Sequence, residues 1–521
     1  MGDAFGLAHD RLTTLWDELA YHASATPDRA ALAFAGRTTT YAALHDQSEA
    51  MATRLIAAGF GPGDRIGYLG KNSDSYFVLL YAVARIGLVL VPLNWRLAEA
   101  EMAFIVADAA MRSLYADAAF LAMASRLAAR EDIPAMLLDY AALLPRSRVA
   151  LPPFVADPHR IVFQVYTSGT TGRPKGAMLT HANMLALRAP GYRAGFAWFP
   201  RRDDTVALVL PVAHIAGTAY ALFGLYAGAQ VAITSEFDPP GVLALIERHR
   251  VSHILLAPAA MQLLMQHPGV ERRDLSSLKF ITYGAAPIAE ALLRAAMALF
   301  GCDFIQMYGM TEAAGGVVAL SPEDHLSSQA DRLRSAGRAM PGVELAVVDD
   351  EWGSLPAGQI GEIAIRSPSV MAGYWRRPDA DVEVLRPDGW MRTGDIGRMD
   401  AEGYLYVLDR AKDTIITGGE NVYPAEVENA IFGHPAVLDV AVVSAPSVTW
   451  GEDVVAILVP RPGTAAPTLV EIRAWLEGRI ARFKMPRRVV LAATLPRNAG
   501  NKLLRRELRA PFWAEEKGAV G

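Results

Sequence analysis

The stretch IGYLGKNSDSYFVLLYAVARIGLVLV, residues 66–91, predicts a strand, a helix and a second strand in direct succession. The short apolar runs at 66–69 and 88–91 are typical of buried strands. Ser73 precedes the helical run as an N-cap, and Gly87 follows it as a C-terminal signal. Such a unit normally joins parallel strands through a right-handed crossover. The stretch therefore predicts a parallel sheet covered by helices.

The same alternation continues on both sides of this unit. A helix is expected at 41–58, ended by Gly59. Strands at 205–210, 231–234 and 253–256 alternate with helices at 219–226 and 242–248. This repetition predicts large mixed sheets flanked by helices. The proline-rich residues 151–158 predict a connector between these regions.

After Asp409 and Arg410 the predicted elements become shorter. A helix is expected at 424–432, then strands at 437–443 and 454–459, and a linker at 461–467. Thr468 and Glu471 predict a capping box for a last helix. That helix would bury one stripe of side chains, namely Leu469, Ile472, Leu476, Ile480 and Phe483. The fold class is therefore α/β, with a large N-terminal domain (1–408) of mixed β-sheets flanked by helices, a hinge (409–410) and a small α+β C-terminal domain (411–521).

Composition excludes several classes of protein. A chain of 521 residues with 52% hydrophobic content is long enough for at least two domains. The formal charge of −5 argues against a nucleic-acid surface. The single cysteine, Cys302, excludes a disulfide framework and is expected to be a small buried hydrophobe. With neither a signal peptide nor a transmembrane segment expected, we predict a cytoplasmic protein.

The loop YTSGTTGRPKG, residues 166–176, combines hydroxyls, glycines and cations. Its glycines allow backbone N–H groups to turn toward phosphate oxygens, and Lys175 supplies a point charge. It is not a Walker A loop, because Pro174 precedes the lysine and Gly176 follows it. The loop predicts a polyphosphate site for ATP, with a plain surface turn as the alternative. Its hydroxyl donors are Thr167, Ser168, Thr170 and Thr171.

Further motifs occur along the chain in a characteristic order. They are YGMTE (308–312), TGD (393–395), DR (409–410), GGENVYP (418–424) and PRNAGNK (496–502). Together with the loop at 166–176, they resemble the adenylate-forming superfamily, specifically its acyl-CoA synthetases. The resemblance covers nearly the whole chain, from the first helix to about Leu508.

The resemblance implies a two-step reaction that uses ATP, Mg²⁺ and coenzyme A. A carboxylate and ATP form an acyl-adenylate and pyrophosphate, and the thiol of coenzyme A then displaces AMP. Two steps are needed because a carboxylate is a poor electrophile until it is joined to a good leaving group. The site must also neutralise charge around the α-phosphate, because two anions meet there.

The resemblance assigns roles to residues on the ATP side. The phosphate ligands are Thr167, Ser168, Gly169, Thr170, Thr171, Gly172 and Lys175. Thr311 would contact the α-phosphate, and Glu312, with Thr167, would hold Mg²⁺. The adenine and ribose would lie against Gly284, Ala285, Ala286, Pro287, Tyr308, Gly309, Asp395 and Arg410. Asp395 can accept both ribose hydroxyls on its two oxygens.

Lys502 is the predicted catalytic cation of the first step, placed between the substrate carboxylate and the α-phosphate. The family usually has Thr-Gly-Lys here, whereas this chain has Gly500-Asn-Lys502, so the loop is expected to differ locally. For the second step, the resemblance implies that the small mobile domain rotates about Asp409. The residues then brought to a pantetheine tunnel or its interface are Gly418, Gly419, Glu420, Trp450 and Lys484.

The acyl pocket is expected around PVAHIAG (211–217), following a strand at the edge of a large sheet. By resemblance, His214 packs beside the carboxylate and gates the coenzyme A channel. The apolar residues 219–226 suit a hydrocarbon tunnel, although for any single side chain there a core position is favoured. Amino acids are disfavoured as substrates, because residues 211–220 include no acidic partner for an ammonium group. A medium- or long-chain fatty acid is favoured, with an aromatic, branched or alicyclic acid as the alternative.

Three other functions are compatible with these motifs. The enzyme could load a carrier protein in trans instead of free coenzyme A. A luciferase-type oxygenase is disfavoured because nothing visible handles oxygen. A nucleotide-binding regulator is disfavoured because Glu312, Asp395 and Lys502 are all present. The expected partners are a small carboxylic acid, ATP and coenzyme A, without nucleic acid, and a homodimer is left open.

Overall fold

The unit predicted at 66–91 forms the centre of a six-stranded sheet in the computed structural model, which describes residues 9–138, 151–167, 174–327, 331–497 and 503–518. β3 (Arg65–Leu69) and β4 (Val89–Leu93) are parallel, with Arg65 opposite Val89. Between them, the Ser73 side chain accepts a hydrogen bond from the Tyr76 backbone at the start of α3 (Asp74–Ile86). Gly87 follows with φ of 75° and ends the helix. The predicted parallel unit is therefore confirmed.

The six-stranded sheet has the order β6-β5-β3-β4-β7-β8. All its pairs are parallel except the last, in which β7 and β8 are antiparallel. Its remaining strands are β5 (Ser113–Ala116), β6 (Ala135–Leu137), β7 (Ile161–Thr167) and β8 (Lys175–Thr180). The helices α4 (Glu99–Asp108) and α5 (Leu121–Arg130) precede and follow β5.

A nine-stranded mixed sheet has the order β15-β14-β13-β12-β11-β9-β10-β1-β2. Its strands are β1 (Ala30–Phe34), β2 (Arg37–Thr40), β9 (Thr205–Leu208), β10 (Gln230–Ile233), β11 (His253–Leu256), β12 (Phe280–Gly284), β13 (Asp303–Met310), β14 (Gly315–Leu320) and β15 (Arg338–Ala339). The expectation of an edge strand before residue 211 is wrong. β9 lies inside the sheet between β10 and β11, because both neighbours pair with it in parallel. Strand order depends on long-range pairing, which the local sequence of β9 does not contain.

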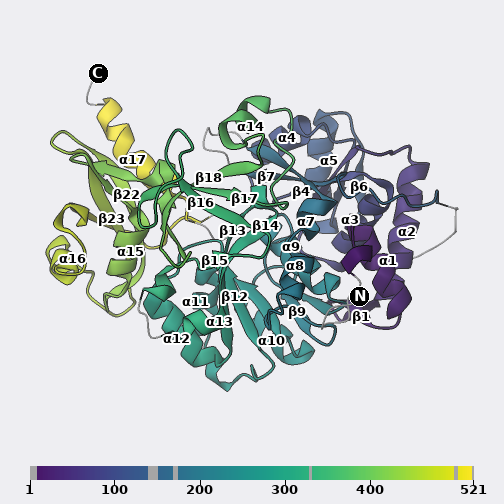
Figure 1. Cartoon of the computed structure of the whole chain (residues 1–521), viewed down its shortest axis with the longest axis horizontal. Coiled ribbons are helices and arrows are strands. Elements are labelled where there is room, and N and C mark those ends of the chain that lie inside the picture. The colour runs from purple at the N-terminus through teal and green to yellow at the C-terminus, as the bar shows by residue number, and fades with distance from the viewer. Residues whose placement is uncertain (1–8, 139–150, 168–173, 328–330, 498–502, 519–521) are drawn as a thin grey trace.

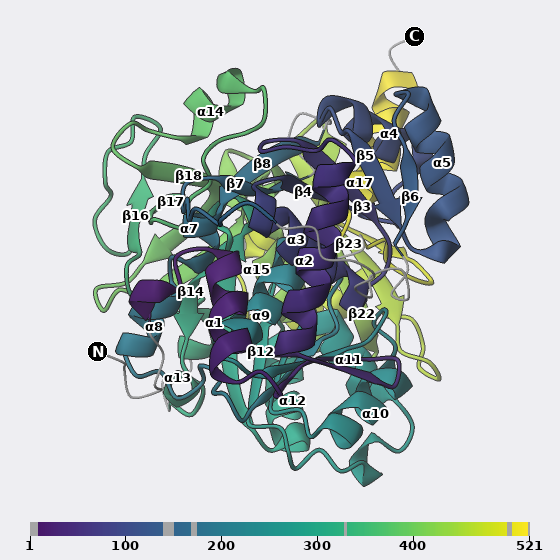
Figure 2. The ribbon, with the colours of Figure 1, turned by 90° about the vertical axis from the view of Figure 1, so that its right-hand side faces the viewer.

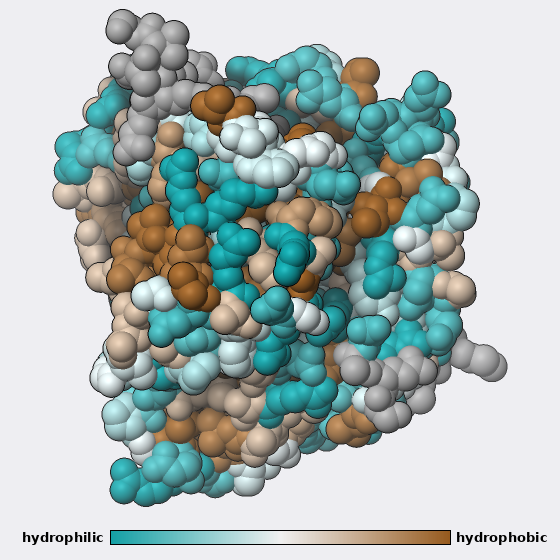
Figure 3. Space-filling model, turned by 90° about the vertical axis from the view of Figure 1, so that its left-hand side faces the viewer, coloured by the Kyte–Doolittle hydropathy of each residue, from teal (hydrophilic) through white to brown (hydrophobic). Residues whose placement is uncertain are grey.

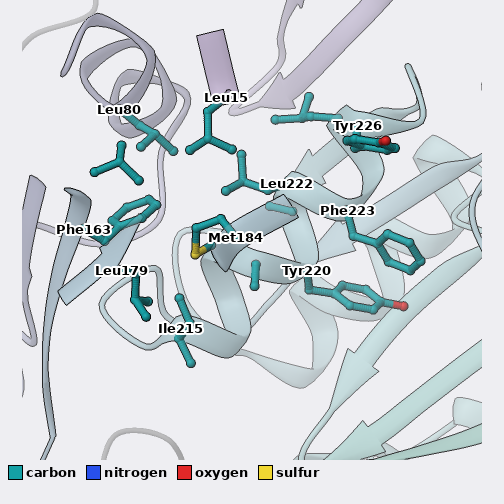
Figure 4. Packing of buried hydrophobic residues seen from close by; sticks show 14 of the residues in the cluster. Leu15, Leu80, Phe163, Leu179, Met184, Ile215, Tyr220, Leu222, Phe223 and Tyr226 are labelled. Atoms are coloured by element: carbon teal, nitrogen blue, oxygen red, sulfur yellow. The ribbon is translucent and has the colours of Figure 1, made fainter. Parts of the chain in front are cut away.

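Helices fill the space between these two sheets. α3 is buried along its whole length because its residues are apolar on nearly all sides. α9 (Ile215–Tyr226) packs on β9, β10 and β14, and the Tyr76 and Thr218 hydroxyls join α3 to α9 at 2.9 Å. α1 (Leu15–Ala25) and α2 (Tyr41–Ala57) pack beside each other and against α3 (Figure 2). Figure 4 shows how Leu15, Leu80 and Leu222 meet in this core.

Seven further helices complete the described part of the large domain. They are α7 (His181–Leu185), α8 (Arg188–Arg193), α10 (Pro239–His249), α11 (Pro258–Gln266), α12 (Glu290–Phe300), α13 (Pro322–His325) and α14 (Pro378–Val384). Cys302 is half-buried among apolar side chains of this region. Burial, with a smaller effect of Asp303, raises the pKa of the Cys302 thiol to about 12, so the thiol stays protonated.

A four-stranded antiparallel sheet leads to the small domain. It consists of β16 (Glu344–Val348), β17 (Ile360–Arg366), β18 (Trp390–Met399) and β19 (Leu405–Arg410) in that order. Beyond it lies a separate five-stranded sheet of β20 (Ile415–Thr417), β21 (Glu420–Val422), β22 (Val437–Ser447), β23 (Gly451–Pro460) and β24 (Arg488–Leu491). This sheet and its helices form one end of the molecule, on the left in Figure 1. The α/β fold class with a small C-terminal unit is confirmed.

The helices of the small domain are α15 (Pro424–Phe432), α16 (Leu469–Leu476) and α17 (Arg505–Gly518). The capping box of Thr468 and Glu471 is present. The predicted helical stripe is too long, because α16 ends at Leu476 and Gly478 adopts a φ of 75°. Ile480 and Phe483 nevertheless pack on the same core from beyond the helix.

The surface of this end mixes hydrophilic residues with separate hydrophobic groups (Figure 3). Val448 is fully exposed there, and Trp450 is 46% exposed. Within the described ranges, no helix combines the length and the apolar character needed to cross a membrane.

Candidate active site

One cavity of about 1300 Å³ is bordered by both large sheets and by the end of the chain. The predicted site residues that line it are Thr167, Lys175, His214, Gly284, Ala285, Gly309, Thr311, Glu312 and Arg410. These residues come from segments separated by more than two hundred positions. The fold thus gathers eight of the twelve predicted ATP-side residues that the structure describes around one space.

The predicted phosphate loop is flanked by two paired antiparallel strands. Thr167 ends β7 and pairs directly with Lys175, the first residue of β8. Both side chains border the cavity, at the end of β7 and the start of β8. The predicted ligands Ser168, Gly169, Thr170, Thr171 and Gly172 lie outside the described residues.

Glu312 is held by two hydroxyl groups. It lies in a 3₁₀ turn (Thr311–Ala313) directly after β13 and is buried, with 8% of its surface exposed. The Thr167 hydroxyl donates to Glu312 Oε1 over 3.2 Å, and the Tyr374 hydroxyl donates to the same oxygen over 2.9 Å. The nearby Lys175 Nζ lies 4.6 Å from the centre of the Tyr374 ring. A carboxylate, a hydroxyl and an ammonium group therefore meet at one wall.

Sequence reasoning missed Tyr374. Its segment reaches the site because Met178 N–H donates to the Gly373 carbonyl and Trp375 N–H donates to the Gly176 carbonyl. Burial, reinforced by Glu312, raises the pKa of Tyr374 well above its usual range, so the phenol remains a proton donor. No local motif around Tyr374 predicts this pairing with β8.

The residues around Glu312 fit a magnesium ion that is shared with a nucleotide. Mg²⁺ is usually bound through one or two carboxylates plus substrate phosphates. Glu312 supplies one carboxylate, and Thr167 and Thr311 supply hydroxyl oxygens at the same wall. Across the described ranges, no cluster of three or more acidic, histidine or cysteine side chains is suited to a metal ion. The remaining ligands would therefore be phosphate oxygens and water.

Two glycines allow backbone segments to approach closely beside the cavity. A Cβ at Gly309 would lie 1.9 Å from the Gly315 carbonyl oxygen, and one at Gly284 would lie 2.3 Å from that of Met307. Neither position can accept a side chain without moving backbone. Ala285, the next residue, adopts a left-handed φ of 65°. Ala286 and Pro287, also predicted to lie against adenine, are not part of the lining.

Asp395 is paired on both of its oxygens. The Tyr308 hydroxyl donates to Asp395 Oδ2 over 2.7 Å, and Arg410 Nε lies 2.7 Å from Oδ1. The pairing arises because Asp395 and Arg410 stand opposite each other on β18 and β19. Thr393, Gly394 and Arg410 line the cavity, whereas Asp395 and Tyr308 lie just behind the lining. A carboxylate has about four acceptor sites, so Asp395 retains capacity for further hydrogen bonds.

His214 is a neutral, unsatisfied group on the apolar side of the cavity. It is the N-cap residue of α9, and its Nε2 is buried without a hydrogen-bond partner in the described part of the chain. Burial, with a smaller effect of Arg96, lowers its pKa to about 4. An imidazole with so low a pKa is a weak base at neutral pH, which favours a contact role over a proton-transfer role.

The wall next to His214 is apolar and aromatic. Ile215, Tyr220 and Phe223 of α9 line it, and Tyr220 and Phe223 project from the same side of the helix (Figure 4). Residues from other segments complete this part, namely Met184, Leu187, Trp198, Phe199 and Met340. Residues 219–226 were expected to line a hydrocarbon tunnel or to pack in the core. Some of their side chains face the cavity and others pack in the core.

The residues predicted for the second step lie away from the cavity. Gly418, Gly419, Glu420, Trp450 and Lys484 are not among its lining residues. Gly418 N–H donates to the Trp450 carbonyl over 2.7 Å, and Lys484 is paired with Glu426. The Asp409 carboxylate accepts hydrogen bonds from the backbone of Arg410 and Ala425.

The segment after Lys502 borders the cavity instead. Lys502 itself lies outside the described residues, but Leu503, Leu504 and Arg505 are lining residues. The structure therefore has the small domain in the orientation in which this segment, and not the 418–420 loop, faces the cavity.

Known protein families match this arrangement along most of the chain. The model of the AMP-binding enzymes matches residues 19–375, and that of the AMP-binding enzyme C-terminal domain matches residues 426–502. The chain belongs to the AMP-binding enzymes. It is an AMP-forming acid–thiol ligase, since similar proteins over nearly its full length are ligases of this family.

Three relatives illustrate the range of this similarity. The fatty acid–[acyl-carrier-protein] ligase ScoC of Streptomyces coeruleorubidus is 39% identical over 518 residues, which cover 99% of each chain. A feruloyl-CoA synthase of an Amycolatopsis species is 38% identical and covers 94% of this chain and 96% of its own. The structure of o-succinylbenzoate coenzyme A synthetase from Bacillus subtilis with ATP and magnesium has a TM-score of 0.84 and 31% identity, covering 95% of this chain and 99% of its own.

Proposed function

We propose that this AMP-binding enzyme activates an apolar carboxylic acid, with a medium- or long-chain fatty acid favoured, and transfers the acyl group to coenzyme A. ATP, Mg²⁺ and coenzyme A are its cofactors. The observation that carries the proposal is that one cavity joins Thr167, Lys175 and Glu312 to an apolar wall that begins at His214.

In the first step, a carboxylate oxygen attacks the α-phosphorus of ATP, and the bond to the bridging oxygen of pyrophosphate breaks. Lys175 would neutralise charge on the departing phosphates, and Thr311 would donate a hydrogen bond to the α-phosphate. Glu312 and Thr167 would hold the magnesium ion, which neutralises phosphate charge when bound. Asp395 and Arg410 would position the ribose. These groups act mainly by orientation and charge, as phosphoryl chemistry requires.

The apolar wall supports the choice of acid. Tyr220, Phe223 and Trp198 offer an aromatic surface, on which a hydrocarbon chain is stabilised by burial. Aromatic, branched or alicyclic acids remain the alternative, and the feruloyl-CoA synthase relative adds weight to it.

A carrier protein is the second candidate acceptor. The ScoC relative is a ligase that uses an acyl-carrier protein, and its similarity extends over 99% of this chain. In that case the thiol would belong to a phosphopantetheine arm instead of free coenzyme A.

We also propose a cytoplasmic location and leave a homodimer open.

A substrate panel tests the proposed function. Release of AMP is measured with straight-chain, aromatic, branched and amino acids, each with free coenzyme A or a phosphopantetheinyl carrier protein. We expect the greatest turnover with a straight-chain acid and free coenzyme A. Preference for an amino acid would refute the proposed acid class, and faster transfer to the carrier would establish the second candidate.

Gly419→Leu is expected to spare adenylation and block thioester formation, because a side chain would fill the proposed pantetheine tunnel. In the present orientation a Cβ at Gly419 has no neighbour within 4 Å, so the clash would arise only after domain rotation. The two half-reactions are measured separately, as pyrophosphate exchange and as coenzyme A transfer from supplied acyl-adenylate.

Gly463→Leu is the matched control for this variant. Gly463 has φ of 80°, close to the 84° of Gly419, and its Cβ would also meet open space. It imposes similar backbone strain in the same domain, away from the proposed tunnel. A normal thioester rate in Gly419→Leu, or an equal loss in both variants, would rule out the tunnel.

A further inference from the structure

Arg188 places a guanidinium group in the apolar wall of the acyl pocket. It is the first residue of α8 and lines the cavity. Its Nη2 donates to the Ala219 carbonyl over 2.7 Å, and its Cζ lies 4.6 Å from the centre of the Phe223 ring. Both contacts are on α9, the helix that begins beside His214.

The guanidinium group of Arg188 has no ion-pair partner among the residues that the structure describes. Its Nε is buried and makes no hydrogen bond within the described residues, and no described carboxylate forms an ion pair with it. Burial lowers the pKa of Arg188, but an arginine remains protonated in proteins. A buried charge without a partner is unfavourable.

Glu18 of α1 is the acid that interacts electrostatically with Arg188, but the two side chains do not form an ion pair. Its Oε1 accepts a hydrogen bond from the Tyr81 hydroxyl over 2.8 Å, and its Oε2 is buried without a partner in the described structure. Burial raises the pKa of Glu18 to about 8, against the opposing effects of Tyr81 and Arg188. Burial therefore disfavours the charged form of the Glu18 carboxyl group.

Two other arginines with little exposed side chain have carboxylate partners, although the buried Nε of Arg202 also lacks a hydrogen-bond partner among the described residues. Arg332, with 6% of its side chain exposed, pairs with Glu402, and Arg505, with 14% exposed, pairs with Glu428. Arg505 also lines the cavity, but its guanidinium group is paired with Glu428, whereas no ion pair is found for Arg188 among the described residues. The missing partner is therefore best sought in the ligand.

We propose that Arg188 binds a second carboxylate, carried by the substrate at a distance from the carboxylate that is adenylated. This inference rests on the proposed function and names the substrate class as a dicarboxylic acid with an apolar middle. The contacts of Arg188 lie five to nine residues along α9 from His214. At about 1.5 Å per residue, the two carboxylates would be roughly 8–14 Å apart. The aromatic wall between them would contact the hydrocarbon part.

The test compares straight-chain monocarboxylic acids with α,ω-dicarboxylic acids of equal carbon number, over a series of lengths, in ATP–pyrophosphate exchange by the full-length enzyme. We expect wild type to prefer the diacid at some length and to accept its monomethyl ester poorly. Arg188→Met should lower kcat/KM for that diacid by about 10- to 100-fold and leave the monoacid unchanged or improved. Arg188→Lys should retain part of the preference, because it keeps the positive charge.

Arg193→Met, at the exposed end of the same helix, is the matched control and should change neither substrate. Thermal shift of wild type provides a readout that does not depend on the variants' folding, since the diacid should raise Tm more than the matched monoacid. If wild type uses both acids equally and both give equal thermal shifts, Arg188 does not bind a second carboxylate. Arg188 would then have a structural role, for example by sharing a bound water molecule with Glu18. Failure of every acid in the panel to support exchange would refute the proposed function instead.

Discussion

Lys502→Ala is expected to reduce carboxylate-dependent ATP–pyrophosphate exchange by at least about 10²–10³-fold, because it removes a preorganised cation from the developing charge at the α-phosphate. Coenzyme A transfer from supplied acyl-adenylate should be largely spared, since the proposed rotation withdraws Lys502 before that step. The cavity position of the next residues, Leu503 and Leu504, supports this assignment. Both half-reactions are measured on the same preparation.

Arg482→Ala is the control for Lys502→Ala. It removes a cation of the same domain whose side chain is 89% exposed, and it should leave both half-reactions unchanged. Equal loss of adenylation and transfer in Lys502→Ala would contradict the division of labour between the two orientations.

Glu312→Gln is expected to lower the adenylation rate by about 10²–10³-fold, by the same electrostatic argument. Glutamine keeps the shape of the side chain and one oxygen that can accept from Thr167 and Tyr374. It removes the negative charge that would hold Mg²⁺ beside the phosphates. The loss should become smaller at high magnesium concentration, which is tested by titrating Mg²⁺ in the exchange assay.

Tyr374→Phe distinguishes the effect of the Glu312 charge from the effect of the hydrogen bond that Tyr374 donates to it. It deletes the 2.9 Å hydrogen bond to Glu312 Oε1 and keeps the carboxylate, so we expect the adenylation rate to fall by no more than about 10-fold.

If Glu312→Gln shows the same magnesium dependence as wild type, Glu312 is not a metal ligand.

Local sequence signals predicted the elements of this fold well. The caps at Ser73 and Thr468 involve hydrogen bonds within three residues, and the apolar runs of β3 and β4 identify buried strands. The end of α16 was predicted too late, because the apolar stripe continues past Gly478 while the backbone does not. Apolar periodicity indicates which face is buried, and the glycine decides where the helix stops.

Long-range pairing accounts for what the sequence left undetermined in the candidate site. Tyr374 contacts Glu312 only because the segment of Tyr374 pairs with β8. The interior position of β9 follows from its two parallel neighbours, β10 and β11. The position of Arg188 in the cavity wall likewise depends on the packing of α8 against α9.

The chain's motifs were therefore sufficient to identify an adenylate-forming enzyme and nine of the residues now found around its cavity, because phosphate and ribose chemistry requires particular groups in short segments. The shape of the acyl pocket and the orientation of the small domain were decided by tertiary packing. Both depend on contacts between segments far apart in the chain, and no local pattern of residues encodes those contacts.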